Sequence, residues 1–317
     1  MPEKRNKNEE LRKAFGSEEL VFTLKKKYLI SSDSKQTPNC TLFQATDTEF
    51  NRKVAIKAVP IEDKSQREIK AALDSARSEV NCMVFAEKKA LAVPRVYDVY
   101  NDRKNNVFYI IMEWINGKTL REKQNASDRQ FIRWMADLCD ILNELDKYHY
   151  HHKDIKPENL MITNDNRIYL IDFNISVSLP NMLEGTANYK APEMDWDSKY
   201  VSRDRSDMFS IGVIMYERFT GELPLLCEHY GNPVGNGKEW GDFIEPKEVR
   251  SDIDPEINKI ITRCMKLNPK SRFNSYGELA KALRGVKYAA KENKHGTGKN
   301  RKGFSQKGRG NSPYGNY

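Results

Sequence analysis

The hydrophobic pattern divides the chain into a strand-rich first part and a helical second part. Short runs of β-branched and aromatic residues, separated by polar turns, predict strands at residues 27–30, 41–46, 53–60, 96–100 and 107–113. Between the third and fourth of these runs, apolar residues three or four positions apart predict one long helix over residues 66–89. The first part is therefore expected to be mostly antiparallel sheet with a single substantial helix.

Helices are predicted to dominate after Gly117. Residues 128–148 carry one apolar stripe at helical spacing. A second apolar helix over residues 205–220 is expected to stop at Gly221, since glycine is common just beyond helix ends. Strands first and helices afterwards predict the α+β fold class, arranged in two lobes.

Composition narrows the class of protein. The 317 residues are 38% hydrophobic and 10% aromatic, a mixture that excludes wholesale disorder. No apolar run reaches the roughly 18 to 20 residues of a membrane helix, and the first residues lack the apolar centre of a signal peptide. We therefore predict a cytoplasmic protein with no membrane partner. The five scattered cysteines include no CxxC pair, which argues against a disulfide framework and a zinc site.

The net charge of +8 is concentrated at the end of the chain. Residues 287–317 hold eight Lys and Arg against one Glu, and so contribute +7. Their six glycines and few aliphatic residues predict a disordered basic tail. A solvated tail is the interpretation that the composition favours, and an arm that contacts nucleic acid or an acidic partner is the alternative.

Candidate chemistry begins in the string HHKDIKPENLMI, which starts at His151. Asp154, Lys156 and Asn159 lie there on a polar, proline-containing loop, and Asp172 follows at the end of an apolar strand. Such a set suits phosphoryl transfer, because one carboxylate can orient a hydroxyl while an amide oxygen and a second carboxylate hold Mg²⁺. For a single motif of this kind an Asx-rich turn is the simpler interpretation.

The order of several motifs changes that judgement. VAIK at 54–57, HKDIKPEN at 152–159, DFN at 172–174 and APE at 191–193 together resemble the eukaryotic-type serine/threonine protein kinases. The resemblance spans residues 26–285 and implies the two-lobed protein kinase fold. It divides the chain into an N-terminal extension, the kinase domain with its two lobes, and the tail. The predicted boundaries are 1–25, 26–286 (N-lobe about 26–112, C-lobe about 117–286) and 287–317.

The resemblance implies a role for one lysine of the sheet. Lys57 is expected to neutralise the α and β phosphates of ATP, and Glu79 on the long helix to hold its ammonium in place. Glu68 and Glu87 are competing candidates for that partner, and a solvated helix-face charge is the alternative for Glu79.

The resemblance also implies roles in the loop and at its metal site. Asp154 would accept or orient the substrate hydroxyl, and Lys156 would offset charge on the moving phosphoryl group. Asn159 and Asp172 would bind Mg²⁺. His152 resembles the structural histidine of the family rather than an acid or a base.

The adenine pocket is expected where the last strand of the sheet ends. Met112 would lie at the back of the pocket, and the backbone of Glu113 and Ile115 would hydrogen-bond the base. Ala55 and Met161 would form apolar walls. Ordinary core packing is the alternative for these apolar side chains.

The acceptor is predicted to be a serine or threonine of a protein. The Asp-x-Lys arrangement at Lys156, with Gly185-Thr186 before APE, resembles serine/threonine rather than tyrosine kinases. The APE-type segment favours protein over small-molecule acceptors, and Glu193 is expected to support it through a buried pair with Arg272.

The chain departs from the family pattern at its phosphate loop. Three glycines are expected at Lys35, Thr37 and Cys40, yet no glycine lies between Gly16 and Gly117. Glycine normally allows backbone amides to approach phosphate closely. The alternative function is therefore a pseudokinase scaffold with weak or no nucleotide turnover.

Smaller departures concern Asn174, where the family has glycine, and Lys153, where it has arginine. A lysine cannot grip a phosphorylated loop in a bidentate way. We therefore expect activity that depends little on phosphorylation of the loop, whose candidate sites are Ser176, Ser178 and Thr186.

Overall fold

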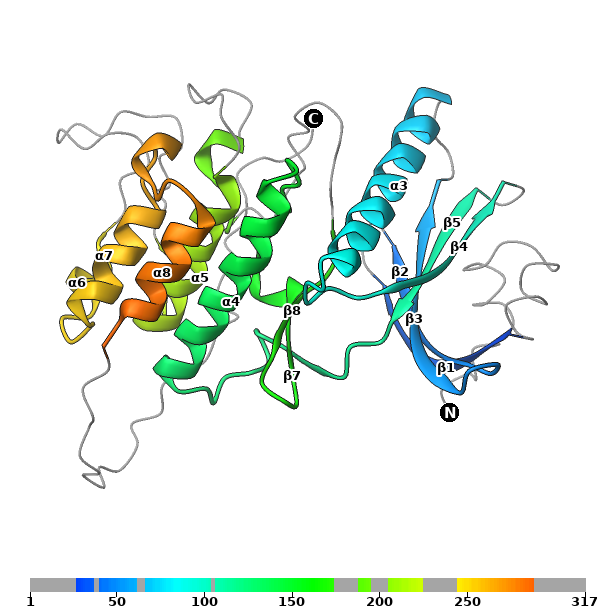
Figure 1. Cartoon of the computed structure of the whole chain (residues 1–317), viewed down its shortest axis with the longest axis horizontal. Coiled ribbons are helices and arrows are strands. Elements are labelled where there is room, and N and C mark those ends of the chain that lie inside the picture. Colours follow the sequence, from blue (N-terminus) through cyan, green and yellow to red (C-terminus); the bar gives the residue numbers. More distant parts are fainter. Residues whose placement is uncertain are drawn as a thin grey trace, which may run out of the picture.

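The computed structural model describes residues 27–36, 40–61, 66–103, 106–173, 188–194, 205–224 and 244–287. A five-stranded sheet with one long helix forms one end of the molecule, and a group of helices forms the other (Figure 1). The predicted α+β class is confirmed. Within these ranges, no helix combines the length and apolar character that a membrane span requires.

The large sheet is antiparallel throughout, with the strand order β1-β2-β3-β5-β4. Its strands are β1 (Tyr28–Gln36), β2 (Thr41–Asp47), β3 (Arg52–Pro60), β4 (Val96–Asp102) and β5 (Val107–Glu113). In β3, Val54, Ile56 and Ala58 join the hydrophobic core on one face of the sheet. Because side chains alternate along a strand, Ala55 and Lys57 point to the opposite face.

The glycine-free segment of the sequence forms a hairpin that is longer than predicted. β1 pairs with β2 as far as Gln36 and Thr41, with a register shift between Ile30 and Ser34. At two of the positions where the family has glycine, Lys35 pairs with Leu42 and Cys40 immediately precedes β2. Residues 37–39 lie outside the described residues, so the effect of the missing glycines on phosphate binding stays a prediction.

Helix α3 (Gln66–Lys88) belongs to both lobes. Its first half packs on the sheet, where Ala76 joins Phe108 and Ile110 in one cluster. Its second half contributes Cys82 and Met83 to the main core of the helical lobe. A residue between the two halves is consequently held at the junction of the lobes.

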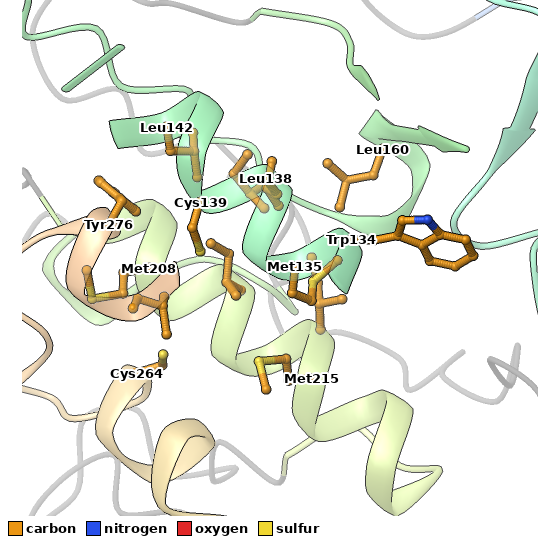
Figure 2. Packing of buried hydrophobic residues seen from close by; sticks show 14 of the residues in the cluster. Trp134, Met135, Leu138, Cys139, Leu142, Leu160, Met208, Met215, Cys264 and Tyr276 are labelled. Atoms are coloured by element: carbon orange, nitrogen blue, oxygen red, sulfur yellow. The ribbon is translucent and has the colours of Figure 1, made fainter. Parts of the chain in front are cut away.

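The helical lobe surrounds the largest core. Its helices are α4 (Asp128–Asp146), α5 (Ser206–Thr220), α6 (Pro246–Val249), α7 (Pro255–Cys264) and α8 (Tyr276–Gly285), with short 3₁₀ turns η1 (Pro157–Asn159), η2 (Pro192–Met194) and η3 (Pro269–Ser271). Figure 2 shows Met135, Leu138 and Cys139 of α4 beside Met208 and Met215 of α5. These side chains are buried, so α4 and α5 pack together and hold the ends of the segment that connects them.

A small three-stranded sheet lies between the lobes (Figure 1). It contains β6 (Gly117–Thr119), β7 (Leu160–Thr163) and β8 (Ile168–Leu170), with β7 in the centre. The loop before β7 and the residues after β8 carry the polar motifs of the sequence. Leu160 at the start of β7 pairs with Leu170 at the end of β8, so the loop that leads into β7 and the segment that follows β8 are neighbours.

The N-terminus of α4 offers a test of local stability. The Ser127 hydroxyl accepts a hydrogen bond from the Gln130 amide over 3.2 Å and caps the helix. We expect Ser127→Ala to lower the free energy of unfolding by about 1 kcal/mol, because a helix amide loses its partner. Urea denaturation measures the change, with the exposed Ser251→Ala as the control. Equal losses in both variants would contradict the assignment of the cap.

Candidate active site

Lys57 connects three segments of the chain at the junction of the lobes. Its ammonium nitrogen lies 2.7 Å from Glu79 Oε1 on α3 and 2.6 Å from Asp172 Oδ1, two residues beyond β8. The Lys57 and Glu79 side chains are buried, whereas that of Asp172 is 44% exposed. The structure therefore places Glu79 beside Lys57, while the competing Glu87 lies near Arg95 and the side chain of Glu68 lies outside the description.

Burial and charge compete in this cluster. Burial acts against the charged form of Lys57, but the neighbouring Glu79 and Asp172 outweigh it, and the pKa of the ammonium is raised. For Glu79 burial dominates and raises the pKa of the carboxyl. For Asp172 burial is outweighed by the charge and hydrogen bond of Lys57, and the pKa is lowered. Of the two carboxyl groups that contact Lys57, Asp172 is thus the one whose ionised form is favoured.

Asp154 is held by two neighbours in its own loop. Lys156 donates from Nζ to Asp154 Oδ2 over 2.6 Å. Asn159 donates from Nδ2 to the same oxygen over 3.0 Å, and to the Asp154 carbonyl over 2.8 Å. Both Asp154 and Asn159 are buried. These contacts fix the direction of the carboxylate and of the Asn159 amide group.

The backbone of this loop is anchored by Asp207, at the start of α5. Its carboxylate accepts hydrogen bonds from the amides of His152 (2.8 Å) and Lys153 (2.7 Å). His152 Nε2 lies 3.1 Å from the Ile171 carbonyl, and its ring packs against Phe173 with centroids 5.1 Å apart. His152 thereby ties the loop to the segment of Asp172, and its contacts are those of a structural residue.

The predicted adenine-pocket residues lie within β3, at and just beyond the end of β5, and on β7. Ala55 of β3 is directly opposite Met112 of β5. The Glu113 amide donates to the Arg95 carbonyl over 2.8 Å, so Glu113 has only its carbonyl to offer a base. Ile115 is buried just beyond β5, and Met161 belongs to the small sheet.

Glu193 and Arg272 form the predicted pair. Arg272 Nη1 and Nη2 lie 2.5 and 2.7 Å from the two oxygens of Glu193, and both side chains are fully buried. Arg272 also donates to the carbonyls of Lys266 and Arg205, each over 2.8 Å. The turn η2 is therefore fixed to the base of the helical lobe.

Several predictions concern residues outside the description. They include Asn174 and the candidate phosphorylation sites Ser176, Ser178 and Thr186. The basic tail also lies there, apart from Lys287. The small role of loop phosphorylation, a nucleic-acid or acidic partner of the tail, the cytoplasmic location and the domain boundaries stay predictions.

Residues 39–284 match the family described as the protein kinase domain. The chain belongs to this family. Members of the family use ATP with a divalent metal and act on proteins. The resemblance predicted from the motifs is confirmed.

Curated relatives carry matching names. A probable serine/threonine-protein kinase of Clostridium acetobutylicum is 30% identical over 278 residues, which cover 83% of this chain and 40% of that protein. Serine/threonine-protein kinase PknB of Mycolicibacterium smegmatis is 30% identical over 205 residues, which cover 59% of this chain and 32% of that protein. The chain thus spans less than half the length of these relatives.

Proposed function

We propose that this kinase domain transfers the γ-phosphate of ATP to serine and threonine hydroxyls of proteins. The observation that carries the proposal is the position of Lys57, whose ammonium contacts Glu79 of the helix and Asp172 of the other lobe at the same time. A lysine ammonium at the junction of the lobes, with one carboxylate from each lobe beside it, suits a binding site for a nucleoside triphosphate.

The donor atoms at the site fit a magnesium ion and a nucleotide. Asn159 and Asp172 offer hard oxygen atoms, which Mg²⁺ prefers, and they would hold the ion together with phosphate oxygens. When bound, Mg²⁺ neutralises charge on the phosphates. Lys57 binds phosphate oxygens, and Glu79 keeps the ammonium pointed toward them. The base lies between Ala55 and Met161, against Met112, with hydrogen bonds to the Glu113 carbonyl and the Ile115 backbone.

Asp154 orients the acceptor hydroxyl and takes its proton. Two donors hold one oxygen of its carboxylate, so the group keeps a fixed direction without help from the substrate. Lys156 brings a positive charge to the same carboxylate, where it stabilises charge on the transferred group. The names of the relatives favour serine and threonine as acceptor residues. The Glu193 segment, which is fixed by its buried pair with Arg272, favours a protein as the acceptor molecule.

Thermal shift combined with labelling tests the proposal. Mg-ATP at about 100 times its Kd should stabilise the protein by about 2.7 kcal/mol, and a labelled γ-phosphate should appear on protein. Asp172→Ala should lose the labelling and most of the Mg-dependent shift, because it removes a metal ligand. The exposed Asp252→Ala, between α6 and α7, is the matched control. If wild type shows neither shift nor label, the proposal is wrong and the pseudokinase scaffold is favoured.

A further inference from the structure

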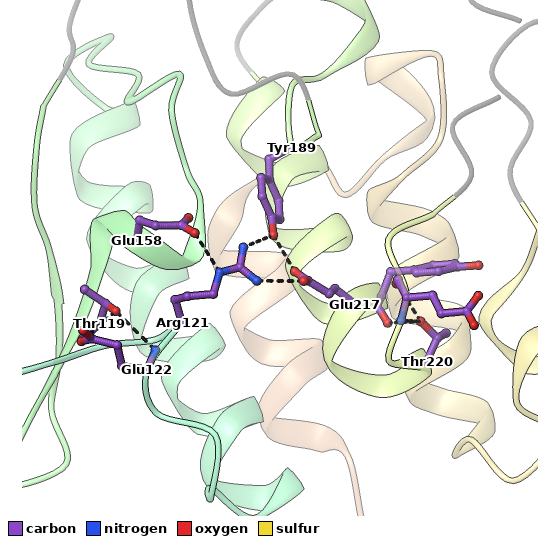
Figure 3. Close-up of polar contacts among 9 residues, drawn as sticks. Thr119, Arg121, Glu122, Glu158, Tyr189, Glu217 and Thr220 are labelled. Atoms are coloured by element: carbon purple, nitrogen blue, oxygen red, sulfur yellow. Dashed lines mark hydrogen bonds and ion pairs between the residues drawn. The ribbon is translucent and has the colours of Figure 1, made fainter. Parts of the chain in front are cut away.

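Arg121 joins three segments that are far apart in the sequence. Its Nε donates to Glu158 Oε1 over 2.7 Å, its Nη1 to Glu217 Oε1 over 2.8 Å, and its Nη2 to the Tyr189 hydroxyl over 2.5 Å. The Tyr189 hydroxyl in turn donates to Glu217 Oε2 over 2.5 Å (Figure 3). Each of the three guanidinium nitrogens therefore contacts a different segment of the chain.

The backbone around Arg121 is itself fixed. The Leu120 side chain is buried, and its amide donates to the Leu160 carbonyl over 2.7 Å. Thr119 and Glu122 bond reciprocally, with the Thr119 amide donating to Glu122 Oε2 and the Glu122 amide to Thr119 Oγ1 (Figure 3). The contacts of its neighbours therefore fix the backbone from which the Arg121 side chain extends.

Charge and burial both raise the free-energy cost of separating Arg121 from Glu158, Tyr189 and Glu217. The Glu217 side chain is 5% exposed and that of Arg121 is 27% exposed. Burial lowers the pKa of the Arg121 guanidinium, but Glu158 and Glu217 outweigh it and the pKa is raised. Burial raises the pKa of Tyr189, and the hydrogen bond with Glu217 raises it further. Among the residues that the structure describes, Arg121 is the cation that pairs with Glu217, so its removal would leave the buried carboxylate without that partner.

The segments that Arg121 connects carry the two sides of the proposed reaction. Glu158 lies in η1, next to Asn159 and within the loop of Asp154. Tyr189 lies shortly before the Glu193 segment, and its carbonyl accepts a hydrogen bond from Ser210 of α5 over 2.8 Å. A shift of either segment would change the distance between the catalytic loop and the support of the acceptor protein.

We propose that Arg121 is a positioning residue that keeps the catalytic loop and the Tyr189 segment in a fixed relative position, so that a protein hydroxyl reaches Asp154. The inference rests on the proposed kinase function. A lysine at this position could not make the same contacts, because its side chain has one nitrogen where Arg121 donates from three.

Two reactions of the same protein separate positioning from chemistry. One is phosphate transfer to dephosphorylated casein, a generic protein acceptor, and the other is ATP hydrolysis without an acceptor. Arg121→Met should lower kcat/KM for casein by about 10- to 100-fold, since small misplacements of reactants are costly, and leave ATP hydrolysis and the KM for ATP unchanged. Arg121→Lys should give little rescue.

A second residue and a control sharpen the comparison. Tyr189→Phe should act in the same direction, and its effect should add little to that of Arg121→Met, because both remove the same connection. Arg284→Met is the matched control, since Arg284 also bridges two carboxylates, Asp137 and Asp140, but on the exposed side of α4. It should leave both reactions unchanged. If Arg121→Met does not fold, Arg121→Lys carries the same comparison.

Hydrogen exchange makes the outcomes distinguishable. In Arg121→Met the amides of residues 188–194 should exchange faster than in wild type. Transfer to casein at the wild-type rate, or an equal loss of transfer and hydrolysis, would overturn the positioning role. If wild type itself neither transfers nor hydrolyses, the proposed function fails. Exchange then decides the matter alone: unchanged protection overturns the role of Arg121, and lost protection supports it.

Discussion

Replacing Asp154 with asparagine should nearly abolish phosphate transfer and leave nucleotide binding intact. Asparagine keeps the shape of the side chain and an oxygen that can accept the hydrogen bond of Lys156, but it cannot take a proton from the acceptor hydroxyl. Loss of such a proton acceptor typically slows a reaction by about 10²- to 10⁴-fold. Initial rates of transfer to casein measure kcat, and the thermal shift with Mg-ATP measures binding.

The control for this variant is Asp165→Asn, on the exposed turn between β7 and β8. It makes the same chemical change outside the loop and should keep the wild-type rate. Transfer by Asp154→Asn at the wild-type rate would falsify the assignment of the proton acceptor. Loss of the Mg-ATP shift in the same variant would instead show that Asp154 acts in binding.

The sheet and the two long apolar helices could be predicted because one local signal decides each of them. β5 occupies the predicted residues 107–113, and α3 ends one residue before the predicted boundary. β1 was predicted too short, because its polar second half has no alternation and forms a strand only by pairing with β2. Pairing of this kind is a tertiary effect that a local pattern does not contain.

Helices α7 and α8 were missed, although both carry start signals. Asp254 before Pro255 accepts hydrogen bonds from the first amides of α7, and Ser275 accepts one from Glu278 of α8. Both helices are short, so the apolar period repeats too few times to be decisive. The caps were the signals that could have found them.

The catalytic motifs and the Glu193–Arg272 pair could be predicted, whereas the anchoring roles of Asp207 and Arg121 could not. Glu79 was preferred among three acidic residues of one helix, and the structure places it beside Lys57. Asp207 was not recognised as an anchor, because its partners are backbone amides 54 and 55 residues away. Arg121 and Glu217 are 96 residues apart, and no spacing in the sequence connects them.

Removing Arg272 should cost the most stability of any single change considered, since it leaves Glu193 charged and buried. The pair is fully excluded from solvent, and Arg272 also satisfies backbone carbonyls of Lys266 and Arg205. Breaking a buried pair from one side typically costs about 3–5 kcal/mol, because the desolvated charge that remains has no partner. We therefore expect Arg272→Met to lower the free energy of unfolding by about that amount, measured by urea denaturation.

The matched control is Lys259→Met, which removes an exposed partner of Glu256 and should have little effect, since water screens both charges. The double variant Glu193→Leu/Arg272→Met separates the attraction between the two charges from the cost of leaving the Glu193 carboxylate buried alone. If the stranded charge causes most of the loss, the double variant should be more stable than Arg272→Met alone, because an apolar pair leaves no buried carboxylate. A double variant whose loss equals the sum of the single losses would show that the two side chains stabilise η2 independently.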